Sequence, residues 1–353
     1  MDVLMVTDHW DEHGGGRERY LAELRTWLTQ HGRRVEIAAA RPHGEHHLAT
    51  QISAFRRAHP TRPVLAVRPA DGATHYQLHS GVYADAFAAE AHAFSSPLRR
   101  MFAGTALRLN RRRQRLLHLE AQLCGPASST QLMAFSEQSR ADLRRRFAVS
   151  DARLVVARPG VDLNVFHPGA VVSRPAGPLR LLFVGHNFEL KGLRFALEAV
   201  AAARQRGIDA HLTVAGRGNE SRDGAMAQRL NITPHVRFAG AIDRETLASM
   251  YRASDLLMHP SFYDPFPRAI VEALACGVPV ATTAACGAAE IITPGETGFV
   301  VNDPRDVSTW VGIIETMADP QRRAAMSEAA ATTGRQFDFN THAAEVAAWL
   351  EAS

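Results

Sequence analysis

The sequence predicts an α/β protein composed of two Rossmann-like domains that face each other across a cleft. Both halves alternate short apolar segments with amphipathic helical segments, which is the pattern of parallel sheets. At 353 residues, the chain is too long for one ordinary core and suggests two domains. A stretch rich in Pro and Gly, 153–178, separates the two series and is typical of an interdomain linker. We therefore expect ligands in the loops at the carboxyl ends of the strands, beside helix N-termini.

Each series begins with an apolar strand. In the first half we expect helices at 17–30 and 137–147, and strands at 3–7, 34–40, 63–67, 75–79 and 131–136. In the second half we expect strands at 179–185, 211–216, 235–240, 255–260, 278–283 and 298–301, followed by helices from residue 303 onward. These elements predict an N-terminal domain (1–172), a C-terminal domain (173–335) and a C-terminal helix (336–353) that packs back on the N-terminal domain.

The composition is ordinary for a soluble globular enzyme, with 46% hydrophobic and 22% charged residues. The chain contains no apolar run long enough for a transmembrane helix, and its first residues lack the pattern of a signal peptide. We therefore expect a cytoplasmic protein. The three cysteines are scattered without a CxxC spacing, so neither a disulfide framework nor a zinc knuckle is indicated.

The positive charges are almost all arginines, and Lys191 is the single lysine in the sequence. Residues 99–118 carry seven arginines and no acidic residue. This segment has two interpretations that remain open: a docking surface for anionic membrane lipids or a phosphorylated lipid acceptor, or a solvated helix face. Nucleic-acid binding is not expected, because aromatic residues hardly interleave with these arginines.

Three loops carry candidate site residues. In the first, Gly15 and Gly16 follow the first strand, where glycine lets a backbone approach a phosphate or sugar. The alternative is a flexible strand–helix connection, and the loop matches neither GxGxxG nor a Walker A motif. In the second, Lys191 stands before a helix, where it could hold a phosphate or could simply be solvated. A lysine is electrostatically unfavourable at a helix start, so we expect an anionic partner.

The third loop holds two carboxylates, Asp264 and Glu272, eight positions apart. Asp264 precedes Pro265 and could be the N-cap of the following helix, which Gly277 would end. Glu272 lies mid-helix on a small, apolar face, and a carboxylate there needs hydrogen-bond donors. Ribose hydroxyls are suitable donors, so we favour a ligand-binding role for the pair.

The stretch that holds these two carboxylates resembles a motif of a known family. The stretch HPSFYDPFPRAIVEALACGVPV (259–280) resembles the acidic–seven–acidic motif of retaining GT-B glycosyltransferases of family 4. Similar resemblances to that family extend over most of the chain, in GGGRERYLAEL (14–24), FSEQSRADL (135–143) and RPGVDLNVFHP (158–168). Within the family, GHNFELKG (185–192) and TTAACGAAEI (282–291) look closest to lipopolysaccharide-core glucosyltransferases.

The resemblance implies a GT-B fold and a role for each matched residue. Lys191 would contact the nucleotide diphosphate, Glu272 the ribose and Asp264 the donor-sugar hydroxyls. His79 would lie near the donor sugar as an active-site residue, with His75 a weaker choice. The remaining donor-binding residues would be Gly15, Gly16, His186, Phe266, Pro267 and Arg268. Three of these positions depart from the family pattern, because Asp264, Pro267 and His186 stand where Glu, Gly and Arg are usual.

The implied activity is transfer of a hexosyl group with retention of anomeric configuration, in the simplest case glucose from UDP-glucose to a cell-envelope glycan or glycolipid. The acceptor would place the protein at the inner face of the cytoplasmic membrane. The sequence contains no Asp-x-Asp, so we expect a metal-independent reaction without a cofactor. Two alternatives remain open: a nucleotide-sugar epimerase of the same layout, and a non-catalytic nucleotide-sugar-binding protein.

Overall fold

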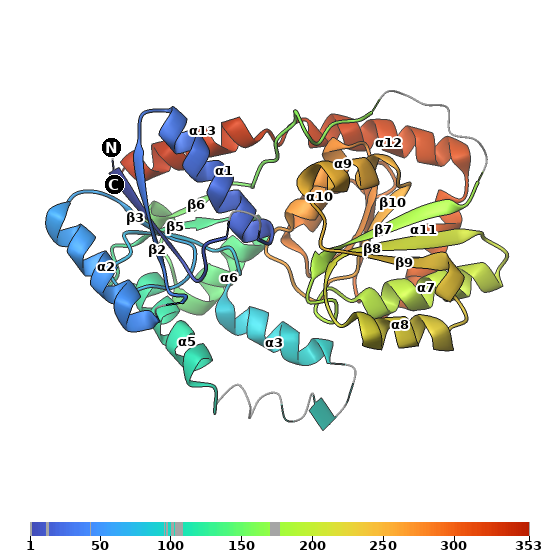
Figure 1. The fold of residues 1–353 in the computed structure, drawn as a ribbon, viewed down its shortest axis with the longest axis horizontal. Helices are drawn as coiled ribbons and strands as arrows, with labels where there is room; N and C mark the ends of the chain where they lie inside the picture. The colour runs from blue at the N-terminus through green and yellow to red at the C-terminus, as the bar shows by residue number, and fades with distance from the viewer. Residues whose placement is uncertain are drawn as a thin grey trace. The chain divides into compact units, whose positions relative to one another are not determined.

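The chain forms two compact units, which Figure 1 shows as separate sheets with their helices. A computed structural model describes residues 2–11, 14–42, 44–94, 96, 98–99, 102, 109–169 and 177–352. The first unit comprises residues 1–88, 101–160 and 339–353, and the second comprises residues 89–100 and 161–338. Each unit contains a six-stranded sheet whose paired strands are parallel, as the alternation of strands and helices predicts.

The first sheet has the strand order β2-β1-β3-β4-β5-β6. Its strands are β1 (Asp2–Thr7), β2 (Arg34–Ala39), β3 (Val64–Ala66), β4 (His75–Gln77), β5 (Gln131–Ala134) and β6 (Leu154–Val156). The helices of this part of the chain are α1 (Gly16–Gln30), α2 (Glu45–Ala58), α3 (Tyr83–Ala93), α5 (Arg111–Cys124), α6 (Glu137–Phe147) and α13 (Phe339–Glu351). A continuous apolar core joins β1, β3, β4 and β5 to α2 and α5.

The second sheet has the strand order β12-β11-β10-β7-β8-β9. Its strands are β7 (Leu179–His186), β8 (Ala210–Arg217), β9 (Val236–Gly240), β10 (Leu256–His259), β11 (Val280–Thr283) and β12 (Gly298–Val301). Its helices are α7 (Leu193–Gln205), α8 (Glu220–Arg229), α9 (Arg244–Arg252), α10 (Arg268–Ala275), α11 (Val307–Met317) and α12 (Pro320–Gly334), with short 3-10 turns that include η2 (Thr233–His235). A second core packs β7, β8 and β10 against α7 and α11.

The unit boundary differs from the predicted one. We expected a linker throughout 153–178, but β6 lies inside this range and pairs with β5 as the last strand of the first sheet. The division falls between Gly160 and Val161, whereas residues 172–173, where we placed it, lie outside the described residues. The sequence after β6 is rich in proline and glycine. Because β6 has only three residues, we did not separate it from this stretch.

The C-terminal helix α13 groups with the first unit and packs against α1. Its inward face carries Phe339, His342 and Val346, which are buried. Among the described residues, none of the helices is both long and apolar enough to cross a membrane.

Candidate functional site

The loop that follows β7 presents Lys191 directly before α7. Two glycines make this possible. Gly192 adopts a φ of 72°, and a Cβ there would lie 2.0 Å from the carbonyl oxygen of Pro260, which is closer than any side chain allows. At Gly185 a Cβ would lie 3.2 Å from Cγ of Lys191, so the absence of a side chain leaves room for the lysine stem. The loop is therefore shaped around the lysine and the end of β10.

The Lys191 ammonium donates a hydrogen bond to the Asp264 carboxylate. Both side chains are largely enclosed, with 17% and 11% of their surface exposed. Asp264 lies in the loop after β10, where its main chain pairs with Cys286 and its carbonyl accepts from the N–H of Gly287 at 2.8 Å. In this structure the ammonium faces a carboxylate of the chain itself, 73 residues further along, and a ligand phosphate as a partner of Lys191 stays a prediction.

Asp264 is not the N-cap of α10, and the capping alternative is wrong. The N-cap is Pro267, which offers no side-chain cap to the helix. The other half of that alternative is confirmed, because α10 ends before Gly277, whose φ is 73°. The Asp264 side chain is free of the helix and faces Lys191 and His259 instead.

His259, the last residue of β10, completes this group. Its Nε2 lies 3.5 Å from Oδ2 of Asp264, and the residue is 1% exposed. Burial lowers the pKa of His259, which keeps the imidazole neutral. Burial alone would raise the pKa of Asp264, but Lys191 and His259 outweigh it and lower this pKa to about 2. The group therefore contains an ionised carboxylate beside an ammonium. Sequence reasoning missed His259, although its place at the carboxyl end of a strand was a signal.

Glu272 lies on α10 and is buried, with 5% of its surface exposed. Its Oε2 accepts a hydrogen bond from the hydroxyl of Tyr251 on α9 at 3.0 Å. Phe266 is buried, Pro267 is the N-cap residue of α10, and Arg268 is the first residue of that helix. The expected need for a donor is confirmed, although the donor in this structure is a tyrosine.

His186 ends β7 and is exposed, and its Nδ1 accepts from the backbone N–H of Arg217 at 3.2 Å. Lys191, Asp264, Glu272, Phe266, Pro267, Arg268 and His186 all belong to the second unit, whereas Gly15, Gly16 and His79 belong to the first.

In the first unit, Gly15 is the N-cap of α1 and Gly16 is its first residue. A Cβ at Gly16 would meet no atom within 4 Å, so packing does not require a glycine there. Gly14 differs, because a Cβ there would lie 2.9 Å from Cβ of Glu18. The open space at Gly16 is compatible with the close approach of a ligand.

His79 follows β4 and contacts the side chain of Gln77. Nε2 of His79 lies 3.3 Å from Oε1 of Gln77. Gln77 in turn donates through Nε2 to the Tyr20 hydroxyl at 3.0 Å, and that hydroxyl lies 2.9 Å from Nε2 of His342 on α13. The ring of His79 also packs edge-on against Phe135. His79 is thus oriented by a buried network.

His75, the weaker candidate, is a packing residue. It is 2% exposed and contacts the Trp349 ring edge-on at 4.7 Å between centroids. Burial lowers the pKa of His75 to about 4, so the imidazole is neutral at physiological pH.

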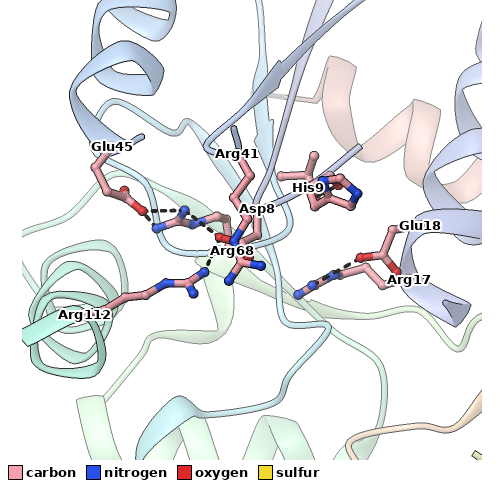
Figure 2. Close-up of polar contacts among 9 residues, drawn as sticks. Asp8, His9, Arg17, Glu18, Arg41, Glu45, Arg68 and Arg112 are labelled. Atoms are coloured by element: carbon pink, nitrogen blue, oxygen red, sulfur yellow. Dashed lines mark hydrogen bonds and ion pairs between the residues drawn. The ribbon is translucent and has the colours of Figure 1, made fainter. Parts of the chain in front are cut away.

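A cluster of arginines and carboxylates follows the first three strands of the first sheet, and Figure 2 shows how its side chains converge. Asp8 comes directly after β1, and Arg41 and Arg68 each come two residues after the end of β2 and β3. Because these three strands are adjacent and parallel, their carboxyl ends share one edge of the sheet. We refer to Asp8, Arg41, Glu45, Arg68 and Arg112 as the arginine cluster.

Arg68 is the buried centre of the arginine cluster, with 2% of its surface exposed. Its guanidinium donates two hydrogen bonds to the Glu45 carboxylate, at 2.8 and 3.0 Å. It donates a third to Oδ1 of Asp8 at 3.2 Å. Such fork-shaped pairing favours arginine over lysine.

The outer arginines of the cluster are more exposed. Nη2 of Arg112 lies 2.5 Å from Oδ1 of Asp8, and Nε of Arg41 lies 3.6 Å from Oδ2. Their side chains are 49% and 59% exposed. Burial alone would raise the pKa of Asp8, but Arg112, Arg68 and Arg41 together lower it. Sequence reasoning did not predict the arginine cluster, although charged residues just after three predicted strands were a signal.

Comparison with known proteins gives three kinds of likeness. Residues 170–333 match the family model described as Glycosyl transferases group 1. A D-inositol 3-phosphate glycosyltransferase 2 of Catenulispora acidiphila is 33% identical over 241 residues, which cover 62% of this chain and 55% of that protein. The chain thus spans about half the length of the curated relatives it matches.

Two solved structures are similar over the whole chain. WaaG, a glycosyltransferase involved in lipopolysaccharide biosynthesis, aligns with a TM-score of 0.82 at 19% identity and full coverage of both chains. Anabaena HepE, solved in complex with UDP-glucose, aligns with a TM-score of 0.72 at 20% identity and full coverage of both chains. These likenesses confirm the predicted fold, two Rossmann-like domains of the GT-B type.

Proposed function

We propose that this protein is a glycosyltransferase that moves a hexosyl group from a nucleoside diphosphate sugar to an acceptor hydroxyl. The observation that carries the proposal is the enclosed group Lys191, Asp264 and His259 at the carboxyl edge of the second sheet. It lies within residues 170–333, which match the glycosyl transferase model. An ammonium at a strand–helix loop is suited to a diphosphate, because helix N-termini and cations both favour anions.

In the proposed donor complex, the diphosphate shares Lys191 with Asp264. The enclosed surroundings strengthen this contact, because water screens charge less there than at the surface. Glu272 accepts from the ribose hydroxyls, and Asp264 accepts from hydroxyls of the donor sugar. His186, Phe266, Pro267 and Arg268 complete the donor contacts in the second unit, and Gly15 and Gly16 supply backbone contacts from the first.

The proposed chemistry is retaining and uses no metal ion. Departure of the nucleoside diphosphate leaves negative charge on the phosphate and positive charge on the sugar ring. Lys191 stabilises the former by preorganised electrostatics, which is commonly the largest catalytic term. His79 lies near the donor sugar as an active-site residue, and its contact with Gln77 fixes the direction of the ring. The acceptor attacks on the face from which the leaving group departs.

We further propose UDP-glucose as the donor. The presence of UDP-glucose in the HepE complex supports this choice, because that structure shares the fold over the full chain. The acceptor is proposed to be a hydroxyl of a cell-envelope glycan or glycolipid that carries an anionic group. Two observations support the anionic group: the half-exposed Arg41 and Arg112 of the arginine cluster, and the phosphate in the names of the curated relatives.

The activity is tested by incubating the purified protein with several nucleotide sugars, with and without an envelope extract or phosphorylated acceptors. We expect release of free nucleoside diphosphate only when an acceptor is present. An epimeric sugar formed without acceptor would instead support an epimerase, and binding without turnover would support a non-catalytic sensor. Matched acceptors with and without a phosphate group test the role of the arginine cluster.

We also propose that segment 99–118 contacts an anionic membrane surface and holds the cytoplasmic protein at the inner membrane face. Residues 100–101 and 103–108 lie outside the described residues. Within the described part, Phe102 and Leu109 are exposed hydrophobic residues, 59% and 77%, and Arg111 and Arg115 are exposed. Arginines beside exposed apolar side chains suit an interface with anionic lipid.

Vesicle binding tests this contact. Arg112 and Arg113 are poor targets, because Arg112 pairs with Asp8 and Arg113 lies over the ring of Phe87. The double variant Arg111→Gln/Arg115→Gln should bind vesicles containing anionic lipid more weakly, with no change on neutral vesicles. Equal binding by the parent and the double variant would eliminate the membrane contact.

A further inference from the structure

Three metal-ligating side chains come together on the second unit, away from the residues used above. Asp209 lies directly before β8, His211 is the second residue of β8, and His235 ends η2 directly before β9. Because β8 and β9 are adjacent and parallel, their amino ends lie side by side. This is the sheet edge opposite the carboxyl-end loops that hold Lys191 and Asp264.

The ligand atoms of the three side chains lie close together. Nε2 of His211 lies 3.1 Å from Oδ1 of Asp209 and 3.4 Å from Nδ1 of His235. One ligand atom from each residue lies within 4.8 Å of the other two. In a tetrahedral zinc site with bonds of about 2.0–2.1 Å, the ligand atoms are about 3.3 Å apart. Two of the observed separations already match this spacing.

The chemistry of the three groups also suits a cation. Nε2 of His211 faces a carboxylate oxygen and a second imidazole nitrogen, and all three are ligand types that divalent transition metals accept. A divalent ion with imidazole and carboxylate ligands would satisfy all three groups at once.

We propose that Asp209, His211 and His235 form a binding site for a divalent transition-metal ion of the zinc type. Water would complete the coordination, since the three side chains leave a fourth position open. We refer to these residues as the Asp209 triad.

Arg204 supports the geometry and limits the affinity. Its Nη1 lies 2.6 Å from Oδ1 of Asp209 and 3.1 Å from the carbonyl oxygen of Ala210. Carboxylates that bind metals are commonly oriented by such outer contacts, and here Arg204 contacts the same oxygen of Asp209 that faces His211. The positive charge of Arg204 nevertheless opposes a cation, so we expect a weaker affinity than that of a structural zinc finger.

The site would tie β8 to the turn before β9. A metal that binds the folded unit and not the unfolded chain stabilises the fold by mass action. Because the triad lies at the amino ends of the strands, the ion is structural or regulatory and takes no part in sugar transfer. The proposal is therefore independent of the proposed function, and either can fail without the other.

The test is a titration of the metal-free full-length protein with zinc chloride, followed by calorimetry and by thermal unfolding. We expect one ion per chain and a rise of a few degrees in the unfolding midpoint. Cobalt(II) should give the visible absorption bands of a tetrahedral site. His211→Ala and His235→Ala should each weaken binding at least tenfold.

The matched control is His46→Ala, which removes an exposed histidine from α2 of the first unit. It should leave zinc binding unchanged. If His211→Ala does not fold, His235→Gln serves in its place, because it keeps the side-chain volume and removes a strong ligand. Absence of saturable binding, or binding equal in the parent and in both triad variants, would overturn the proposal.

Discussion

The two sheets place charge at their carboxyl edges in contrasting ways. In the second unit, one lysine is enclosed with one carboxylate and a neutral histidine. In the first, three arginines surround two carboxylates, and two of the arginines are about half exposed. Removing one partner of an enclosed ion pair leaves the other charge buried and unpaired, which lowers the stability of the fold considerably. Exposed ion pairs each contribute little to stability. The second unit thus holds a fixed charge pair, whereas the outer ion pairs of the arginine cluster are individually weak.

The largest effect is expected for Lys191→Ala. This change leaves the Asp264 carboxylate enclosed without its cation, and we expect a loss of about 3 kcal/mol in the free energy of unfolding, together with loss of sugar transfer. The matched control is the double variant Lys191→Met/Asp264→Asn, which removes both charges. Chemical denaturation should show that the double variant regains most of the stability, while an activity assay shows no transfer. Parental activity in either variant would contradict the role of the lysine.

The acid stability of the second unit should reflect the same pair. The pKa of Asp264 is lowered to about 2 in the folded chain, from 3.8 when unfolded. Between these values the unfolded chain binds more protons, so the contribution of Asp264 is present above pH 4 and is lost as the pH falls towards 2. We expect it to amount to about 2 kcal/mol.

Denaturation at several pH values checks this sign. The difference in unfolding free energy between the parent and Asp264→Asn should shrink as the pH falls from 5 to 2. A difference that stays constant over this range would show that Lys191 and His259 do not hold the carboxylate ionised.

Variants of Glu272 and Tyr251 should separate an effect on stability from an effect on donor binding. Tyr251→Phe removes the donor to a buried carboxylate and should cost about 1–2 kcal/mol in stability. Glu272→Gln keeps an acceptor for Tyr251, so stability should change by less than about 1 kcal/mol while donor binding weakens. Calorimetric titration with the nucleotide sugar measures the second effect. Unchanged affinity in a folded Glu272→Gln variant would remove Glu272 from the donor site.

The smallest effect on stability is expected for Arg112→Gln. Its side chain is 49% exposed, so the loss should stay below about 1 kcal/mol. Arg68→Met is the matched comparison, because it removes the buried centre of the same cluster and should cost several times more. For acceptor binding, we expect Arg112→Gln to weaken a phosphorylated acceptor and to leave an uncharged one unaffected. Equal effects on both acceptors would argue against an anion site.

The strands and the main helices were predictable because their apolar periodicity is local. β7 and α1, for example, lie within one residue of their predicted ends. Lys191, Asp264 and Glu272 could be singled out from the sequence by their charge in a strand–loop–helix pattern, and their role in a ligand site stays a prediction. Their partners were not predictable. The Lys191–Asp264 pair joins residues 73 positions apart, and Tyr251 reaches Glu272 from another helix.

Other features depend on tertiary packing and left only weak signals. β6 is three residues long and lies beside a Pro- and Gly-rich stretch, so its pairing with β5 decides its structure more than its own sequence does. The Asp209 triad escaped detection because His235 is distant in sequence and becomes a neighbour only through the pairing of β8 with β9. The arginine cluster required the strand order β2-β1-β3, which periodicity does not reveal.

The most direct test of the proposed donor site is a crystal structure of the protein with UDP. We predict that a diphosphate oxygen lies within hydrogen-bond distance of Nζ of Lys191, and that Glu272 accepts from the ribose hydroxyls. A nucleotide bound elsewhere, with Lys191 still paired only with Asp264, would contradict the proposed donor site.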